Sequence, residues 1–328
     1  MSHQTHGERV LRSSIGFLAI LLSGRIIFGA DIRLGIVSTD TSHVIHFTRI
    51  LNEERDPEHV PGARVVAAYK GGSPDIPSSR NRVDGFEHEL IEIYHVEIVA
   101  DIPTLCSKVD GLLLESGDGR VHLAQARQAI AAKKPLFIDP PLASTLEEAR
   151  EIALLAKQAG VPWFSSSTVR FDEIATAAKY ADATGVDVWG PGPMEEHHYL
   201  DLSWYAIHPI ELLFTLMGTG CEQVTRMAGG DFSSGSDVIV GRWKDGRIGT
   251  VRTLRPYGQW GGFVIRPKQM VSIHAATTLR YGPIVRQIVA FFQTGKPPAP
   301  NDETLEMFAF MDAAQRSKTA NGQPMPLR

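Results

Sequence analysis

Residues 31–143 predict a Rossmann-like doubly wound α/β domain with a parallel sheet, and residues 144–328 predict a second α/β domain with a large, mostly antiparallel open sheet. Short β-rich runs alternate with segments of helical periodicity up to about residue 143, which is typical of strands joined by crossover helices. Beyond residue 160, strands are separated by tight turns such as that at 244–246, which favours antiparallel pairing.

The first domain is expected to hold five strands, at residues 32–37, 64–69, 96–99, 111–115 and 135–138. Its helices are expected at residues 41–53, 82–94 and 122–132. The residues from Ser144 to Glu148 are typical of a capping box, and Gly160 suits a left-handed C-terminal cap. A helix bridging the two domains is therefore predicted between them.

The second domain is expected to contain strands at residues 163–166, 186–189, 238–243 and 249–254. Its helices are expected at residues 171–182, 208–217, 282–294 and 303–319, with the last packing back on the first domain. Four large apolar residues of the last helix are predicted to be core: Met307, Phe308, Phe310 and Met311.

The overall composition is that of a mildly acidic globular protein, with 33 Lys and Arg against 37 Asp and Glu. No basic stripe suggests a nucleic-acid partner, so a small neutral or polar ligand is expected. Cys106 and Cys221 lie far apart and imply neither a zinc site nor a disulfide framework.

The first thirty residues differ from the rest. Two arginines precede the apolar run 15–22, and small residues stand just before Asp31. This pattern predicts an export signal and a periplasmic or other exported protein, although Arg25 and Phe28 depart from it. A mis-assigned start or a loose leader on a cytoplasmic protein is the alternative. The run is too short to span a membrane comfortably.

The turn after the first strand is where a Rossmann domain carries its glycine-rich phosphate loop, and here the glycines are missing. Ser38, Asp40 and His43 would place side chains there instead. Asp40 next to a diphosphate would cost on the order of 4 kcal/mol per close pair of unit charges. Asp40 would alternatively serve as the N-cap of a helix starting at Thr41.

A dinucleotide, NAD or NADP, would have to use the groups around this turn and the following strand ends. Hydroxyls at a helix N-terminus still attract an anion, but Lys70 stands where a ribose-binding acid is usual. The candidate cofactor-binding residues are Ser38, Thr39, Asp40, Thr41, Ser42, His43, Lys70, Glu115 and Ser116.

Acid-base candidates occur at two places. Asp139 follows an apolar strand and precedes two prolines, so it is expected at the carboxyl end of the sheet, either in a site or bonded to loop amides. His208 and Glu211 are three residues apart at a helix start and share one face. We expect His208 to act as general acid or base, Glu211 to orient it, and Tyr205 to donate nearby.

Substrate contacts are expected from aromatic and basic side chains of the second domain. Arg255 and Tyr257 lie in a glycine-punctuated loop that either covers a sugar or packs at a rim or subunit contact. The candidate substrate-binding residues are Arg170, His198, Trp204, Arg255 and Tyr257. His197, His198 and His208 have no diagnostic metal spacing, so no metal site is predicted.

Several local motifs, in order along the chain, resemble those of the Gfo/Idh/MocA oxidoreductases, the glucose-fructose oxidoreductase and inositol dehydrogenase family. Residues 133–143, KKPLFIDPPLA, stand where the family has GKxVxxEKPLA. His46 and His122 match family histidines, 166–171 resembles a strand end with an Arg-Phe pair, and 208–211 resembles HxxD. Residues 314–317 with Gly322 resemble the closing helix and last strand.

The resemblance implies a Rossmann domain that binds NAD or NADP, a sugar or polyol substrate, and a homo-oligomer through the open sheet. Three functional positions depart from the family pattern: the glycine loop is absent, the motif lysine is Pro140, and the aspartate four residues before the histidine is Trp204. A proline side chain cannot transfer a proton, so hydride chemistry would need another proton handler.

Three hypotheses follow. The first is an NAD(P)-dependent sugar or polyol dehydrogenase with an altered loop. The second is a cofactor-independent carbohydrate lyase or hydrolase on the same scaffold, with Asp139 and His208 as its proton-handling pair. The third is a carbohydrate-binding protein. Export favours the second, because free NAD is scarce outside the cytoplasm and no twin-arginine pair precedes the apolar run.

Overall fold

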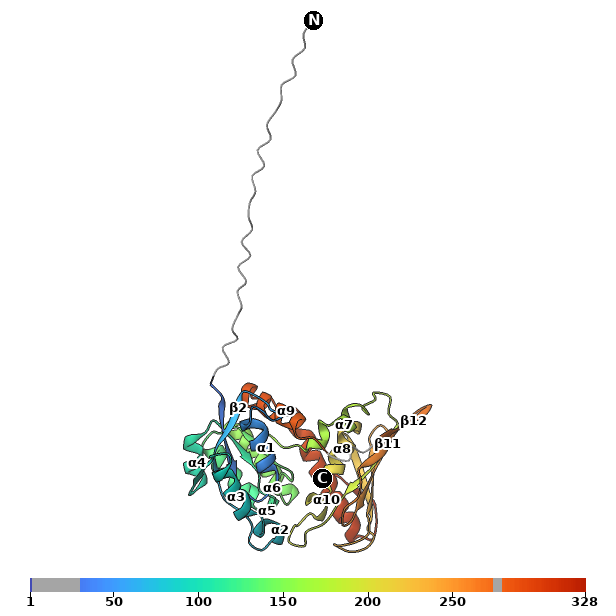
Figure 1. Ribbon diagram of the computed structural model, residues 1–328. Helices are drawn as coiled ribbons and strands as arrows, with labels where there is room; N and C mark the ends of the chain where they lie inside the picture. Colours follow the sequence, from blue (N-terminus) through green and yellow to red (C-terminus); the bar gives the residue numbers. More distant parts are fainter. Residues whose placement is uncertain (2–29, 274–278) are drawn as a thin grey trace.

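Two β-sheets and their covering helices form the structure, a computed structural model that describes Met1, residues 30–273 and residues 279–328 (Figure 1). The predicted leader, residues 1–30, lies almost entirely outside the described residues. Among the helices of the described part, none combines the length and apolar character needed to cross a bilayer.

The first sheet is parallel throughout and has the strand order β3-β2-β1-β4-β5-β6. Its strands are β1 Ile32–Val37, β2 Ala63–Tyr69, β3 Glu97–Val99, β4 Gly111–Leu114, β5 Leu136–Ile138 and β6 Trp163–Phe164. The order reverses between β1 and β4, which is where ligands bind in open α/β sheets. The predicted doubly wound sheet is confirmed.

One strand was expected in the wrong sheet. β6, predicted at residues 163–166 as part of the antiparallel sheet, pairs in parallel with β5. Because β6 has only two paired residues, its sequence is too short to predict which strand it pairs with. The preceding helix, α6 (Leu146–Ala159), places it beside β5 at the edge of the first sheet.

Helices cover both faces of the parallel sheet (Figure 1). The helices before β6 are α1 His43–Asn52, α2 Pro77–Arg80, α3 Val83–Glu92, α4 Ile102–Lys108, α5 Gly119–Ala131 and α6 Leu146–Ala159. One face packs on α1, α3 and α9 (Gly282–Thr294), and the other packs on α4, α5 and α6. The short α2 and α4 were not predicted.

The predicted caps of α6 are present. Thr145 Oγ1 accepts a hydrogen bond from Glu148 N at 3.1 Å, and the Glu148 carboxylate accepts one from Ser144 N at 3.2 Å. Gly160 ends the helix in the left-handed region, with φ of 65°. Local sequence is sufficient for this helix, because its caps satisfy its own terminal amides.

The second sheet is mixed and mostly antiparallel, with the order β12-β11-β7-β10-β9-β8-β13 and one parallel pair, β7 with β10. Its strands are β7 Gly185–Pro191, β8 Cys221–Met227, β9 Val238–Trp243, β10 Ile248–Leu254, β11 Gly261–Arg266, β12 Gln269–Ile273 and β13 Met325–Pro326. The expected large open sheet is confirmed, although β8, β11, β12 and β13 were not predicted.

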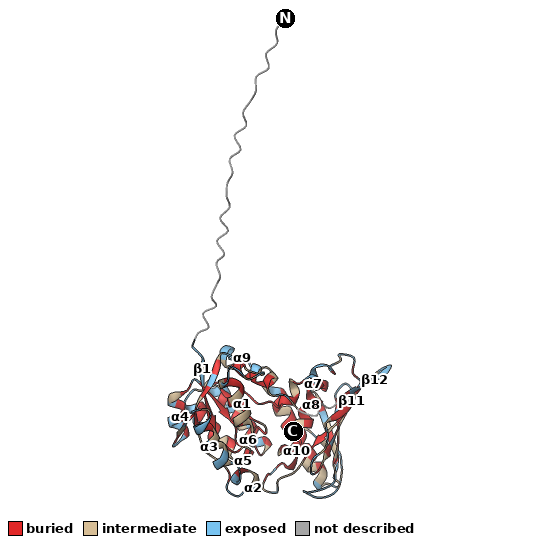
Figure 2. Ribbon diagram, in the orientation of Figure 1, coloured by how far each residue is buried: buried red, intermediate tan, exposed pale blue. Residues whose placement is uncertain are grey.

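Helices α8 (Ile207–Met217) and α10 (Asn301–Thr319) lie against one face of this sheet. Along β10, Val251 and Thr253 are buried whereas Ile248 and Arg252 are exposed, so the other face is open to solvent (Figure 2). The helix expected at 171–182 is reduced to α7 (Glu173–Thr176), which follows the 3-10 turn η1 (Thr168–Arg170); a second 3-10 turn, η2 (Asp201–Ser203), lies between β7 and α8.

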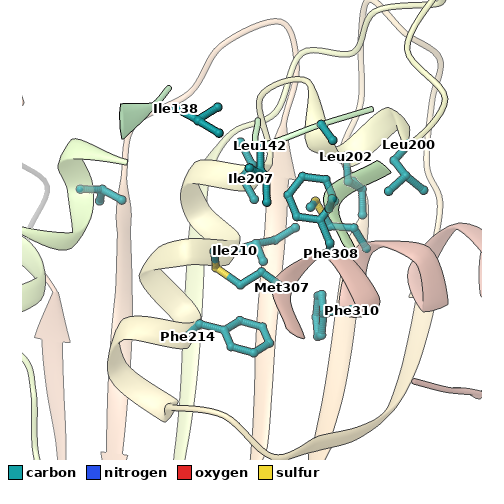
Figure 3. Close-up of a cluster of buried hydrophobic side chains, with 14 of the residues drawn as sticks. Ile138, Leu142, Leu200, Leu202, Ile207, Ile210, Phe214, Met307, Phe308 and Phe310 are labelled. Carbon is teal, nitrogen blue, oxygen red and sulfur yellow. The ribbon is translucent and has the colours of Figure 1, made fainter. Parts of the chain in front are cut away.

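A continuous apolar cluster joins the two sheets. Ile138 at the end of β5, Phe214 of α8 and Phe308 of α10 belong to it (Figure 3). Met307, Phe308, Phe310 and Met311 are all buried, as predicted. Since α8 is fixed from both sides by this cluster, its first turn is held opposite the carboxyl edge of the parallel sheet.

Candidate active site

A cavity of about 450 Å³ lies where the carboxyl ends of the parallel strands meet the first turn of α8. It brings together nine residues predicted from the sequence: Asp40, Thr41, Ser42, His43, Asp139, Trp204, Tyr205, His208 and Tyr257. Its lining also includes residues that were not predicted, among them Ser78, Ser79, Arg82, Pro193 and Tyr281. Ser78 and Ser79 lie in α2, which is too short to give a periodic signal.

One end of the cavity is formed by an ion-paired histidine. His43 Nδ1, in the first residue of α1, lies 2.7 Å from Asp139 Oδ2, just after β5. Burial alone would lower the pKa of His43, but the charge and hydrogen bond of Asp139 outweigh it and raise the pKa. This pair can bind a ligand hydroxyl or hold a proton.

Glu115, immediately after β4, lies beside this pair. Its side chain is fully buried, and neither carboxylate oxygen has a hydrogen-bond partner among the described residues. Burial, together with the charges of Asp139 and Asp40, raises its pKa well above the usual value. Glu115 therefore favours the protonated form or a bound cation.

His208 faces the cavity from the first turn of α8. Its Nδ1 lies 2.8 Å from Ser167 Oγ. Burial lowers its pKa to about 4, which outweighs the opposing charge of Asp139. The ring is thus neutral near pH 7 and has a free nitrogen lone pair, although the lowered pKa makes it a weaker base than an exposed imidazole.

Glu211 does not orient His208 as expected. Its carboxylate accepts hydrogen bonds from Ser167 N and Arg170 Nε, both at 2.7 Å, and from Ser166 Oγ. A buried carboxylate needs this compensation, and Arg170 supplies it. Ser167 is therefore the direct partner of His208, held in place by Glu211; the serine run at 165–167 was the available signal in the sequence.

Aromatic side chains form the opposite wall. Tyr205 contacts His208 and Tyr257 edge to face, with ring centroids 4.9 and 5.2 Å apart. Burial raises the pKa of Tyr205, so its phenol stays a hydrogen-bond donor. Trp204 also lines the cavity, and Tyr257 is 63% exposed at its mouth. Such walls suit the apolar faces of a sugar ring.

The turn between β1 and α1 is built differently from the prediction. The helix begins at His43, and its N-cap is Ser42, without a side-chain capping bond. Asp40 is buried and accepts hydrogen bonds from Ser38 Oγ at 2.8 Å, Ser79 Oγ at 2.6 Å and Gly117 N at 3.2 Å. The expected capping role of Asp40 is wrong, because its carboxylate instead accepts hydrogen bonds from its own turn, from α2 and from the loop after β4.

The loop after β2 packs directly on this turn. Gly72 N donates to Ser38 Oγ at 3.1 Å, and a Cβ at Gly71 would lie 2.9 Å from Ser38 Cα. Thr39 Oγ1 is 3.2 Å from the carbonyl of Lys70. The loop after β2 therefore packs on the start of the turn, at Ser38 and Thr39, whereas Asp40, Thr41 and Ser42 line the cavity.

The other candidate cofactor residues are also engaged within the protein. Lys70 pairs with Asp84 and Glu87 at 2.8 and 2.7 Å. Ser116 Oγ donates to Gln125 at 2.8 Å. Of the nine candidates, Thr41, Ser42 and His43 line the cavity beside Asp40.

Three expected substrate contacts lie outside the cavity lining. Arg170 is paired with Glu211 and Glu303, and Arg255 with Asp237 at 2.9 Å. His198 is buried; its Nε2 accepts from Gly119 N at 3.2 Å. Buried polar groups of this kind must be satisfied internally, which single residues in a sequence do not reveal.

Comparison with known proteins agrees with this architecture. Residues 61–166 match the Gfo/Idh/MocA family model, described as an oxidoreductase family with an NAD-binding Rossmann fold, so the resemblance seen in the sequence is confirmed. The search of curated proteins found no match.

Solved structures with the same fold include dehydrogenases crystallised with NAD. The scyllo-inositol dehydrogenase of Lactobacillus casei with NAD(H) and scyllo-inositol is 15% identical, with a TM-score of 0.71 over 90% of this chain and 99% of its own. The myo-inositol dehydrogenase of L. casei with NAD(H) and myo-inositol is 16% identical, with a TM-score of 0.70 over 91% and 97%. GenD2 from gentamicin A biosynthesis, in complex with NAD, is 16% identical, with a TM-score of 0.72 over 98% and 100%.

Proposed function

From the premise that residues 61–166 form a Gfo/Idh/MocA family domain, we propose that this chain acts on a sugar, polyol or related carbohydrate by proton transfer, without NAD or NADP. The observation that carries the proposal is the glycine-free turn between β1 and α1. Its Asp40 places a buried carboxylate beside the expected diphosphate position, while the cavity that this turn lines keeps its acid-base groups and aromatic wall.

The family match itself supports this division. It begins at residue 61, after β1 and α1, so it does not include the turn that would hold a diphosphate. The matched part of the scaffold therefore supports the family fold, whereas the match gives no support for a diphosphate-binding turn before residue 61.

His208 is the proposed general base. In the proposed tautomer, His208 Nδ1–H donates to Ser167 Oγ, which lies 2.8 Å away and also accepts a hydrogen bond from Val169 N. Nε2 then holds the lone pair and removes a proton from the ligand, whose electron pair stays on the ligand. Tyr205 and the His43–Asp139 pair supply donors and acceptors for the remaining hydroxyls.

The second candidate is an NAD(P)-dependent sugar or polyol dehydrogenase, which the family description and the NAD-bound structural neighbours favour. Calorimetric titration of the purified protein with NADH and NADPH separates the two. We expect no binding below millimolar concentration, because the Asp40 carboxylate would face the diphosphate and the turn has no glycines that would let it approach the backbone. Micromolar binding of either nucleotide would establish the dehydrogenase instead.

Ligand binding is tested by thermal shift with a panel of hexoses, uronic acids and inositols. At least one member should raise the melting temperature of the wild type, and Tyr257→Ala should reduce that shift. Tyr199→Ala is the matched control, because Tyr199 is similarly exposed but lies outside the cavity lining. With a binding member as substrate, His208→Ala should lower turnover by roughly 10²–10⁴-fold. Binding without any turnover would indicate a carbohydrate-binding protein.

Export and self-association complete the proposal. The leader-like pattern of residues 1–30 supports export, which would place the chain where free NAD is scarce. The open face of the mixed sheet, with Ile248 and Met270 exposed, supports a homo-oligomer formed through that face.

A further inference from the structure

Three metal-ligating side chains converge at the point where the strand order of the parallel sheet reverses. His43 begins α1, Glu115 follows β4, and Asp139 follows β5. One donor atom from each lies within 4.8 Å of the others, and no other such group occurs among the residues that the structure describes. The three are far apart in the sequence, so only the sheet brings them together.

Glu115 is the unusual member. It is fully buried with both oxygens unpartnered, although a buried carboxylate is costly unless it is paired or bound to a metal. Its near neighbours add to the negative charge: Asp139 and Asp40 are also carboxylates. Asp40 has three hydrogen-bond donors of its own, and Asp139 has His43, but Glu115 has none.

We propose that His43, Glu115 and Asp139 bind a divalent transition-metal ion. A cation placed among them would satisfy the orphaned oxygens of Glu115 and offset the excess of negative charge. One imidazole with two carboxylates suits Mn²⁺, Fe²⁺, Co²⁺ or Zn²⁺ better than Mg²⁺ or Ca²⁺, which prefer oxygen ligands alone.

The position of the site gives the ion access to a ligand. His43 and Asp139 line the cavity, whereas Glu115 does not and lies behind them. Three protein ligands leave coordination positions open, as in catalytic metal sites. An ion here would polarise an oxygen of a molecule bound in the cavity, which His208 also lines. The site goes beyond the proposed function, because neither carbohydrate binding nor proton transfer by His208 requires it.

The test uses the metal alone. Chelator-treated protein is titrated with Mn²⁺, Co²⁺ and Zn²⁺ by calorimetry, and Co²⁺ binding is followed by visible absorption. We expect one ion per chain at micromolar concentration. Glu115→Gln and His43→Gln should each weaken binding by at least about 100-fold, since even loss of an outer partner costs 10–100-fold.

Asp110→Asn is the matched control. Asp110 immediately precedes β4, whereas Glu115 follows the other end of the same strand. Asp110 pairs with the exposed Arg33. The Asp110→Asn variant should bind metal like the wild type. Near-ultraviolet circular dichroism should show that all variants are folded. Absence of binding below millimolar metal, or unchanged affinity in Glu115→Gln, would overturn the site. Neither result depends on the carbohydrate assays, so the two proposals fail separately.

Discussion

Two buried clusters of charge in this molecule differ in how completely they are paired. The first, called the paired cluster, is on the mixed sheet and consists of Arg226, Arg255, Lys318, Asp201 and Asp237. Arg226 binds Asp201 at 2.7 Å and also contacts Asp237, which Arg255 binds at 2.9 Å. Lys318 completes it at 2.8 Å from Asp201.

The second, called the unpaired cluster, is at the edge of the parallel sheet and consists of Asp40, Glu115, Asp139 and His43. Three carboxylates here share one imidazole, and both oxygens of Glu115 lack a hydrogen-bond partner. The contrast teaches that buried charge by itself does not mark a functional site. In a fully paired cluster the loss of one member leaves its partners buried and unpaired, whereas an incompletely paired cluster indicates a missing ligand or proton.

The largest effect is expected from breaking the paired cluster. Arg226→Met would leave Asp201 and Asp237 buried with fewer counter-charges, so the free energy of unfolding should fall by about 3–5 kcal/mol. Denaturant unfolding followed by circular dichroism measures it. Arg266→Met is the control: the side chains of Arg266 and its partner Asp182 are 29% and 52% exposed, so this pair is partly screened by solvent and the loss should be below about 1 kcal/mol. Equal losses in the two variants would contradict a structural role for the paired cluster.

In the unpaired cluster, removal of a charged side chain is expected to raise the free energy of unfolding instead of lowering it. Glu115→Met replaces an unpartnered buried carboxyl by an apolar side chain of similar length, so the metal-free protein should become more stable by about 1–3 kcal/mol. The same unfolding assay, run with chelator, measures this gain.

Glu211→Met is the matched variant for that measurement. Glu211 is equally buried but is bonded to Ser167 and Arg170, so its replacement should destabilise the protein. If Glu115→Met were as destabilising as Glu211→Met, then Glu115 would be a structural residue and the comparison between the clusters would fail.

The smallest effect concerns the pH dependence of the paired cluster. Burial would raise the pKa of Asp201, but hydrogen bonds and charge from Arg226 and Lys318 lower it below the usual value. Because the folded protein then binds this proton less readily than the unfolded chain, the stabilising contribution is complete above about pH 4 and is lost as the pH falls further. Unfolding measured across acidic pH should therefore depend less steeply on pH in Asp201→Asn. An unchanged slope would mean that Asp201 does not titrate in this range.

Strong local patterns explain where sequence prediction succeeded. The helix predicted at 282–294 has the bounds of α9, and the caps of α6 are those expected from Thr145, Glu148 and Gly160. Predictions failed where a residue's partner comes from a distant element. Asp40 suited an N-cap, but two of its donors come from α2 and the loop after β4, which the first turn meets only after the sheet forms.

The candidate site was predicted in part for the same reason. Asp139 and His208 were found because each ends or begins a recognisable element. Glu211 was expected to orient His208 because the two share a helix face, and Arg255 to contact the substrate because it lies in a glycine-punctuated loop. Their guanidinium and carboxylate partners lie more than ten residues away in the sequence, so burial and pairing were not visible.

By itself, the sequence determined the two-sheet architecture, the family resemblance and the absence of a glycine-rich phosphate loop, because periodicity, caps and missing glycines are local properties of the chain. Only the tertiary structure decided that the loop after β2 packs on Ser38 of that turn and that His43, Glu115 and Asp139 meet at one end of the cavity. Those features depend on which strand ends become neighbours, and strand order is fixed by packing between distant segments.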